Sequence, residues 1–489
     1  MTSEHTYSPS DIVALDALEL SSAIRERRVS CREVMSAYLA HIERINPKVN
    51  AIVALQNGID LLRQADERDR QLAAGEYLGW MHGMPHAVKD LAMTRGIPTT
   101  YGSLLFKDFV PDTDDFFVER IRKQGAIIIG KTNAPEFALG SNSYNSVYGM
   151  TYNAYDQGYI AGGSSGGAGV ALALKLVPVA DGSDMMGSLR NPAAYNNVYG
   201  FRPSAGVVPT GPGSELFLNN LMTNGAMGRT VADVAALMGT IAGYEQRAPT
   251  SAPLAATDYN RSLERDFKGT RIGWLGDLHG YLPMEAGVMD VCRDTFKAFE
   301  TIGCSVAEVS KAELDFDPAR LWKPWLVHRN SLVAGAWGEA YKDPAKRALM
   351  KPELIWEIEG GLKWTLGDLT HASAERTAWY EAFHKLFEHY DYLLMPTAQM
   401  FPFSAEQHWA TAVAGKSMDT YHRWMEIAIS VPLAGAPAIS VPAGFSQKGL
   451  PMGVQIIGKR FDDFEVLKLA HAYEAATHLE RKLPALLQP

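Results

Sequence analysis

The chain has 489 residues, 47% of them apolar, and a net charge of −9 at neutral pH, so it can bury a large core. An acidic chain does not offer the basic face that binds nucleic-acid phosphates, and we expect no nucleic-acid partner. The three cysteines are widely spaced and form no CxxC pair, which argues against disulfides or a thiolate metal site and for a reducing, cytoplasmic environment.

The N-terminal stretch, residues 1–16, is polar and acidic and lacks the basic and then apolar order of a signal peptide. Two helices are predicted over residues 9–46, where Ser30 and Glu33 can form a capping box. A third helix is predicted over about residues 58–75. No run of 18 apolar residues occurs in the sequence, so we expect no membrane-spanning helix and no membrane partner.

Short apolar runs alternate with helical patterns along the middle and end of the chain. Three isoleucines at residues 127–129 predict a buried strand, and residues 177–180 and 439–441 show a similar pattern. Helical patterns lie between them, over residues 166–175 and 229–243. This alternation predicts an α/β protein with a large mixed, mostly parallel β-sheet sandwiched by helices.

Residues 320–425 differ in composition from the rest, since they hold eight of the ten tryptophans. One interpretation is a helical, aromatic-lined region that contacts substrate or forms a lid. The other is ordinary helix packing or an intermolecular contact. Because no internal repeat or long linker divides the chain, we expect a single domain over residues 1–489, with N-terminal helices over about residues 9–75 and the tryptophan-rich region as an insertion.

Residues 161–169 contain two serines, Ser164 and Ser165, with a pair of glycines on either side. Such a backbone must turn sharply and lie close to another part of the chain. A helix is predicted immediately afterwards, and its free N-terminal N–H groups would face the loop. On this segment alone, a phosphate cradle and a serine-based catalytic loop both remain open.

A literal phosphate-loop pattern, G-x-x-x-x-G-K-T, occurs at residues 125–132. Three isoleucines between its glycines favour a strand over the flexible loop that phosphate binding needs. Pro135 also interrupts the helix that should follow. We therefore expect Lys131 to be structural and no nucleotide to bind here.

Residues 184–192 favour the catalytic interpretation of the glycine–serine loop. They follow the predicted strand at 177–180, so Ser188 should lie in a turn just beyond a strand end, where α/β enzymes place their chemistry. Successive backbone N–H groups near Gly187 could bind an oxyanion.

A serine nucleophile also needs a base at neutral pH. No histidine stands in a recognisable catalytic motif, so lysine is the alternative, as in Ser-Lys variants of the catalytic triad. Lys89 lies among apolar neighbours, and full burial could lower the pKa of its amine far enough for it to accept a proton. Two other interpretations remain for Lys89: a solvated surface charge, and an ion pair with Asp90.

Taken in order, these motifs resemble those of the amidase signature family over about residues 30–475. The segments that carry the resemblance are residues 83–90, 130–137, 162–167, 184–192, 228–233, 437–442 and 449–455. Their number and order make the resemblance specific. It implies the amidase signature fold and hydrolysis of C–N acyl bonds, with no metal and no cofactor.

The resemblance implies a catalytic role for three residues. Ser188 would be the nucleophile, Ser164, after a cis peptide bond from Gly163, would relay its proton, and Lys89 would be the neutral base. Water would then hydrolyse the acyl-enzyme. The implied oxyanion hole consists of the backbone N–H groups of Met185, Met186, Gly187 and Ser188. The residues expected to contact substrate are Gly163, Met186 and Tyr159.

Some positions depart from the usual pattern of the family. Met186 stands where glycine is common, and we expect its side chain to narrow the acyl side of the pocket. Tyr159 and Val207 stand where arginine is frequent, which suggests a less polar pocket. We therefore expect a monomeric or homodimeric amidase for small hydrophobic or aryl amides, with carbamate (urethane) or ester hydrolysis as a side activity. The alternative is the glutaminase-like component of an amidotransferase complex.

Overall fold

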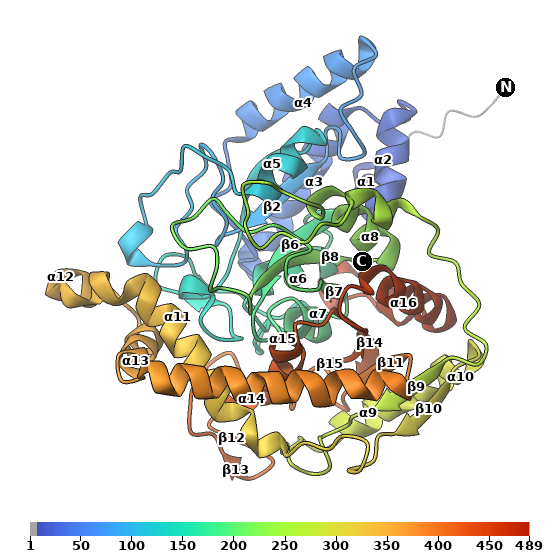
Figure 1. The fold of residues 1–489 in the computed structure, drawn as a ribbon. Coiled ribbons are helices and arrows are strands. Elements are labelled where there is room, and N and C mark those ends of the chain that lie inside the picture. The colour runs from blue at the N-terminus through green and yellow to red at the C-terminus, as the bar shows by residue number, and fades with distance from the viewer. Residues whose placement is uncertain (1–6, 489) are drawn as a thin grey trace.

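The computed structural model describes residues 7–488, so the first six residues of the stretch judged unlike a signal peptide lie outside it. Helices occupy the N-terminal part of the chain (Figure 1): α1 (Pro9–Ala14), α2 (Ala17–Arg25), α3 (Cys31–Ile45) and α4 (Gly58–Ala73). The predicted capping box starts α3, because Ser30 Oγ accepts the Glu33 N–H and Glu33 accepts the Ser30 N–H. The two helices predicted over residues 9–46 are in fact three, since a second capping box between Asp16 and Glu19 starts a new helix.

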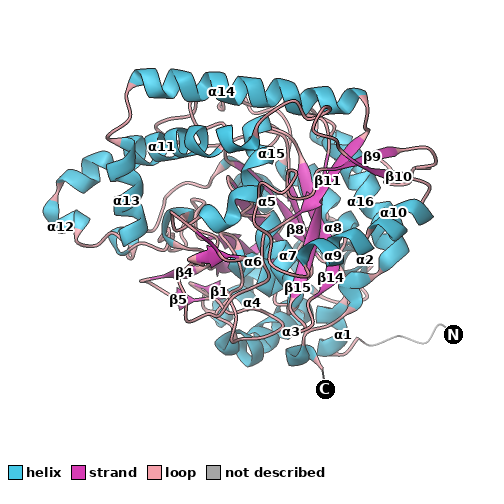
Figure 2. Ribbon diagram, turned by 90° about the horizontal axis from the view of Figure 1, so that it is seen from below, coloured by secondary structure: helices cyan, strands magenta, loops and turns pink. Residues whose placement is uncertain are grey.

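An eight-stranded sheet crosses the centre of the molecule, with helices on both sides (Figures 1 and 2). Its strands, in sheet order, are β10 (Ser305–Glu308), β9 (Arg271–Trp274), β11 (Tyr392–Pro396), β15 (Pro451–Ile457), β14 (Ala438–Phe445), β7 (Tyr199–Arg202), β8 (Thr223–Gly228) and β6 (Val179–Asp184). The flanking helices are α5 (Phe116–Lys123), α6 (Gly166–Ala173), α7 (Arg190–Asn196), α8 (Val231–Ile241), α9 (Val288–Asp294), α10 (Phe296–Thr301), α15 (Ser430–Ala434) and α16 (Asp463–Thr477).

The pairing within this sheet corrects the expectation of mostly parallel strands. Five of its seven neighbouring pairs are antiparallel, and only β9 with β10 and β9 with β11 are parallel. The hairpin of β14 and β15 shows why: residues 446–450 alone join the two strands, and so short a connection permits only an antiparallel pair. The mixed α/β fold with a large helix-covered sheet is confirmed.

A second sheet of three strands, in the order β1 (Ile52–Val53), β3 (Ile127–Thr132) and β2 (Pro85–Lys89), lies beside β6. The predicted isoleucine strand is β3, and it continues through Lys131 and Thr132. The phosphate-loop pattern therefore ends in a buried strand, as predicted. Lys131 Nζ donates to Ala92 O at 2.6 Å and Thr94 Oγ1 at 2.7 Å, which is a structural role.

The tryptophan-rich region forms α11 (Trp322–Lys342), α12 (Pro344–Arg347), α13 (Pro352–Gly361) and α14 (Leu366–Lys385). The helix α14 is fastened to α15, because Trp379 Nε1 donates to Ser430 O at 2.9 Å and Arg376 Nε to Leu433 O at 3.0 Å. Trp325 and Trp379 are fully buried, whereas Trp356 is 39% exposed, so the tryptophans serve packing and surface alike. Within residues 7–488, none of the helices combines the length and apolar character needed to cross a bilayer.

Candidate active site

Lys89 ends β2 and extends its amine among three serine hydroxyls. Its Nζ donates to Ser164 Oγ at 2.8 Å, to Ser165 Oγ at 2.9 Å and to Ser183 Oγ at 2.9 Å, and the residue is only 2% exposed. Burial lowers the pKa of Lys89 to about 7, against the opposing influence of the Asp181 and Asp184 carboxylates. An amine of this kind can be neutral at neutral pH and accept a proton.

The structure excludes both simpler interpretations of Lys89, since its side chain is neither solvated nor paired with Asp90. The Asp90 carboxylate binds elsewhere: it accepts the Thr100 N–H at 2.9 Å, the Thr100 hydroxyl at 2.5 Å and the Gly102 N–H at 3.3 Å. The neighbouring acid therefore anchors a loop and leaves the lysine amine to the hydroxyls.

The glycine–serine loop packs directly against the segment that carries Ser188. The peptide bond between Gly163 and Ser164 is cis, as the resemblance implied. The Ser165 N–H donates to Ser188 O at 3.1 Å, and the Gly163 N–H donates to Asn191 Oδ1 at 3.1 Å. A Cβ on Gly167 would lie 2.3 Å from the Asn133 backbone nitrogen, so only glycine allows this approach.

The Ser188 segment is a turn between a strand and a helix, as predicted: β6 ends at Asp184 and α7 begins at Arg190. Asp184 holds the turn together, since its carboxylate accepts the Gly187 and Leu189 N–H groups and pairs with Arg190 at 2.9 Å. Burial alone would raise the pKa of Asp184, but Arg190 and Arg202 outweigh burial and hold that pKa well below its usual value. The carboxylate is therefore ionised and rigidly bound.

The amides predicted to form an oxyanion hole differ in their availability. The Gly187 N–H donates to Asp184 Oδ1 at 2.8 Å, so it is engaged within the turn. Those of Met185, Met186 and Ser188 have no hydrogen-bond acceptor in the part of the chain that the structure describes. Gly187 has a φ of +81°, and a Cβ there would lie 2.9 Å from Ala428 Cβ, so the turn requires glycine at this point.

Two of the predicted substrate contacts lie in or beside this site. Gly163 precedes the relay serine, and Met186 is 4% exposed within the core, next to the turn. Tyr159 is half-buried and pairs through its backbone with Ser404, and within residues 7–488 no contact recorded for it reaches Lys89, Ser164 or Ser188. Sequence reasoning placed Met186 in the pocket, whereas it is Met185 that reaches towards the tryptophan-rich helices.

Met185 contacts a buried cluster that the sequence did not reveal. Its Sδ lies 3.7 Å from Arg329 Nη1, and Arg329 Nε donates to Glu357 Oε1 at 2.5 Å. Tyr421 completes the cluster, since it accepts from Arg329 at 2.8 Å and donates to Glu357 at 2.5 Å. Arg329 and Glu357 are 3% and 0% exposed, so α11 and α13 meet the turn through a fully paired ion pair.

The chemistry of Ser183 also escaped the sequence analysis, although a signal for it existed. Alternate residues of a strand face the same side, so Asp181 and Ser183 of β6 both face β2. Asp181 accepts the Lys89 backbone N–H at 3.2 Å, while Ser183 accepts from the Lys89 amine. The strand period could have paired these residues, but only the fold shows that β2 lies opposite.

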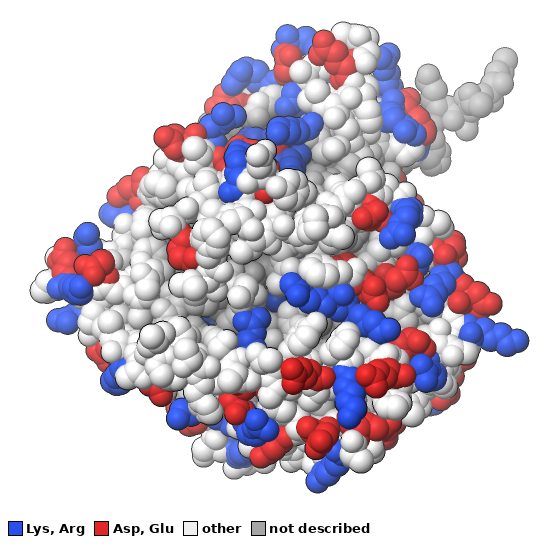
Figure 3. Space-filling view, in the orientation of Figure 1, with Lys and Arg blue, Asp and Glu red and all other residues white. Residues whose placement is uncertain are grey.

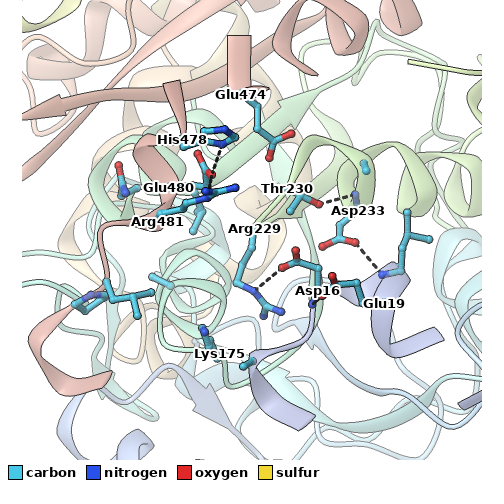
Figure 4. Close-up of a pocket in the computed structure, with 18 of the residues that line it drawn as sticks. Asp16, Glu19, Lys175, Arg229, Thr230, Asp233, Glu474, His478, Glu480 and Arg481 are labelled. Carbon is cyan, nitrogen blue, oxygen red and sulfur yellow. Dashed lines mark hydrogen bonds and ion pairs between the residues drawn. The ribbon is translucent and has the colours of Figure 1, made fainter. Parts of the chain in front are cut away.

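A cavity of about 480 Å³ lies elsewhere, between the N-terminal helices, α8 and α16 (Figure 4), and none of Lys89, Ser164 and Ser188 lines it. Its charged groups serve its own walls: Arg229 Nε lies 3.5 Å from Asp16, Asp233 accepts the first N–H groups of α2, and Glu474 accepts the Val231 N–H. This cavity is therefore a structural junction. Residues 7–488 contain no group of three or more His, Cys, Asp or Glu side chains that could hold a metal ion.

Comparisons with known proteins agree with this site. The model of the Amidase family matches residues 33–467. The A-type subunit of the glutamyl-tRNA(Gln) amidotransferase of Acaryochloris marina is 32% identical, covering 97% of this chain and 100% of that protein. An acylamidase of Rhodococcus erythropolis is also 32% identical, covering 96% and 97%. The structure of a bacterial aryl acylamidase superposes with a TM-score of 0.89 at 26% identity, covering 96% and 99%. The chain therefore belongs to the amidase signature family, and hydrolysis of C–N bonds is the activity that this membership supports.

Proposed function

We propose that this chain hydrolyses neutral hydrophobic amides, including aryl amides, through an acyl-enzyme on Ser188. The observation that carries the proposal is the 2.8 Å hydrogen bond from the buried Lys89 amine to Ser164 Oγ, in a loop whose next residue binds Ser188 O. A base, a relay hydroxyl and a serine in a strand–turn–helix segment are the parts that acyl transfer needs.

The proton moves through these parts in both directions. Ser188 Oγ attacks the carbonyl carbon and gives its proton to Ser164 Oγ, whose own proton passes to the neutral Lys89 Nζ. The amides of Met185, Met186 and Ser188, which have no acceptor within residues 7–488, stabilise the tetrahedral oxyanion. The C–N bond then breaks as Lys89 returns the proton through Ser164 to the leaving nitrogen. A water molecule, deprotonated by the same relay, hydrolyses the ester on Ser188.

A neutral substrate fits the charges around the turn. The guanidinium that contacts Met185 belongs to Arg329, which is committed to Glu357 and Tyr421 and is not free to bind a carboxylate. Leaving a substrate carboxylate without a partner in a buried site would be costly. Figure 3 shows a largely uncharged area, hollowed in its middle, left of centre on the face viewed, with charged side chains gathered along the rim.

Aromatic side chains lie on two sides of the site, which favours aryl groups. Tyr421 of the Arg329 cluster contacts Trp356 edge-on, with ring centroids 5.8 Å apart. On the other side, the rings of Phe137 and Trp337 are 4.1 Å apart and join α11 to the segment that leads to Asn142, whose backbone lies beside Gly163. Carbamate and ester carbonyls ask for the same nucleophile and oxyanion donors, so we propose them as side activities.

A substrate panel tests this proposal. It compares an anilide, an aliphatic primary amide and glutamine, with the matching ester and carbamate of the anilide acid. We expect kcat/KM for the anilide to exceed that for glutamine by about 100-fold or more, since an unpaired carboxylate costs several kcal/mol on burial. Glutamine as the preferred substrate would contradict the proposal.

The second candidate is the glutaminase-like component of an amidotransferase complex, favoured by the 32% identity over the full length of one such protein. That function requires partner proteins, whereas we propose a monomer or homodimer that acts on a small molecule alone. Size-exclusion chromatography with light scattering, combined with the glutamine assay, separates the two. Glutaminase activity that appears only on adding the other components would favour the complex.

A further inference from the structure

Behind Lys89 lies a buried pair, His86 and Asp181, that the mechanism above does not use. His86 Nε2 is 2.9 Å from Asp181 Oδ1, and the two residues are 0% and 1% exposed. The other carboxylate oxygen, Asp181 Oδ2, accepts the backbone N–H of Lys89 at 3.2 Å. One carboxylate therefore binds both the second residue of β2 and its last residue, which carries the amine.

The pair stands at the seam between the two sheets. The strand β2 is the last strand of the three-stranded sheet and β6 the last of the eight-stranded sheet, and the described strands show no ladder pairing between these two. Side chains of β6 supply hydrogen bonds there instead. Asp181 holds the backbone of Lys89, and Ser183, two residues on, holds its amine. Both ends of the lysine are thus set by one face of one strand.

The charges around the pair are few. Asp181 is faced by His86 and Lys89 from β2, by Lys131 from β3 and by Asp115 at the start of α5, and Asp184 is the second carboxylate that faces Lys89. His86 Nδ1 has no partner within residues 7–488, so a second proton on the ring would be a buried donor without an acceptor. The ring therefore gives Asp181 a neutral Nε2–H, and the negative charge of the carboxylate remains to act on the lysine.

We infer that His86 and Asp181 are positioning residues for proton transfer: they hold the end of β2 so that Lys89 reaches Ser164, and the Asp181 charge sets the proton affinity of the amine. The inference rests on the proposed role of Lys89 as base. Asp181 favours the protonated amine and so opposes burial, which favours the neutral amine. Without that carboxylate the amine would be a weaker base.

The pH dependence of kcat/KM tests the inference. Activity needs the neutral amine, so kcat/KM rises with pH through the pKa of Lys89. Asp181→Asn keeps an oxygen for the Lys89 N–H and removes the charge, so its acidic limb should move to lower pH by about one pH unit. His86→Gln keeps an N–H donor and should leave the limb in place. His86→Leu removes the donor, and kcat should fall about tenfold with KM unchanged.

A matched control is Asp233→Asn, another fully buried carboxylate, which binds the first N–H groups of α2 and does not face Lys89. It should lower the melting temperature without moving the limb. A folded Asp181→Asn enzyme with a wild-type pH profile would overturn the inference. If that variant does not fold, a wild-type kcat and profile for His86→Leu overturns it equally. Lys89→Met separates the two claims, because an active Lys89→Met enzyme refutes the base itself, whereas an inactive one leaves only the role of the pair in question.

Discussion

Lys89 shows how a fold turns an ordinary surface residue into a base. Its amine meets three hydroxyls and no carboxylate at hydrogen-bond distance, so nothing compensates fully for the loss of water. Burial is the largest influence on its pKa and brings it to about 7. A proton acceptor matched to neutral pH is what general-base catalysis requires.

The pH profile of the enzyme should report this amine. Since the neutral form accepts the proton, kcat/KM should increase with pH through about 7 and reach a plateau above it. Lys89→Met should lower kcat/KM by about 10³-fold or more, because general-base catalysis is lost along with the relay. Lys131→Met is the matched control, since Lys131 is equally buried but binds Ala92 O and Thr94. An acidic limb that persists in Lys89→Met would assign it to another group.

The serines around Lys89 should separate by role. Ser164→Ala interrupts the relay and should lower kcat by about 10³-fold or more, as for other members of catalytic units. Ser183→Ala removes only a hydrogen bond to the same amine and should cost about tenfold or less, in line with about 1 kcal/mol for a neutral hydrogen bond. Steady-state kinetics of the two variants decide the point. Equal losses would mean that Ser164 merely anchors the lysine.

At the scale of elements, the helices α11 and α13 are locked to the catalytic turn rather than hinged above it. Arg329 of α11 and Glu357 of α13 form a buried ion pair that Tyr421 completes, and Arg329 contacts Met185. The long helix α14 is tied to α15 by Trp379 and Arg376. A lid, one of the two interpretations of this region, would need freer attachments than these.

Breaking the buried ion pair should be expensive. Arg329→Met leaves the Glu357 carboxylate without its cation, which should lower the free energy of unfolding by about 3–5 kcal/mol. Denaturant titration measures that loss. The double variant Arg329→Met/Glu357→Gln removes the unpaired charge and should recover part of it. If Arg329→Met alone unfolds at the wild-type denaturant concentration, the pair does not anchor these helices.

At the scale of the whole molecule, local patterns predicted more than long-range ones. The isoleucine strand, the capping box of α3 and the turn after β6 follow from neighbouring residues, and the structure has all three. Strand directions depend on how distant segments meet, and the mostly parallel sheet was a wrong expectation. The meeting of Lys89 with Ser164, 75 positions apart, could be predicted only through the family resemblance. Arg329 and Met185 share no motif, and nothing local indicated their contact.

The seam between the two sheets is where these scales join. The strand β2 brings the base, β6 leads into the turn with Ser188, and the glycine loop before α6 lies between them and binds both. Each serine and the lysine thus comes from a different element, so the site exists only when the sheets are docked. Rigid scaffolding of this kind keeps catalytic groups in place before substrate arrives.

The central claim is that Ser188, activated through Ser164 by Lys89, forms a covalent acyl-enzyme. The most direct measurement is labelling with a fluorophosphonate at pH 8, followed by peptide mass spectrometry, in the wild-type enzyme and in Ser188→Ala and Lys89→Met. The account predicts one adduct on Ser188, none in Ser188→Ala, and a labelling rate reduced by about 10³-fold in Lys89→Met. An adduct on another residue, or labelling that survives Ser188→Ala, would contradict it.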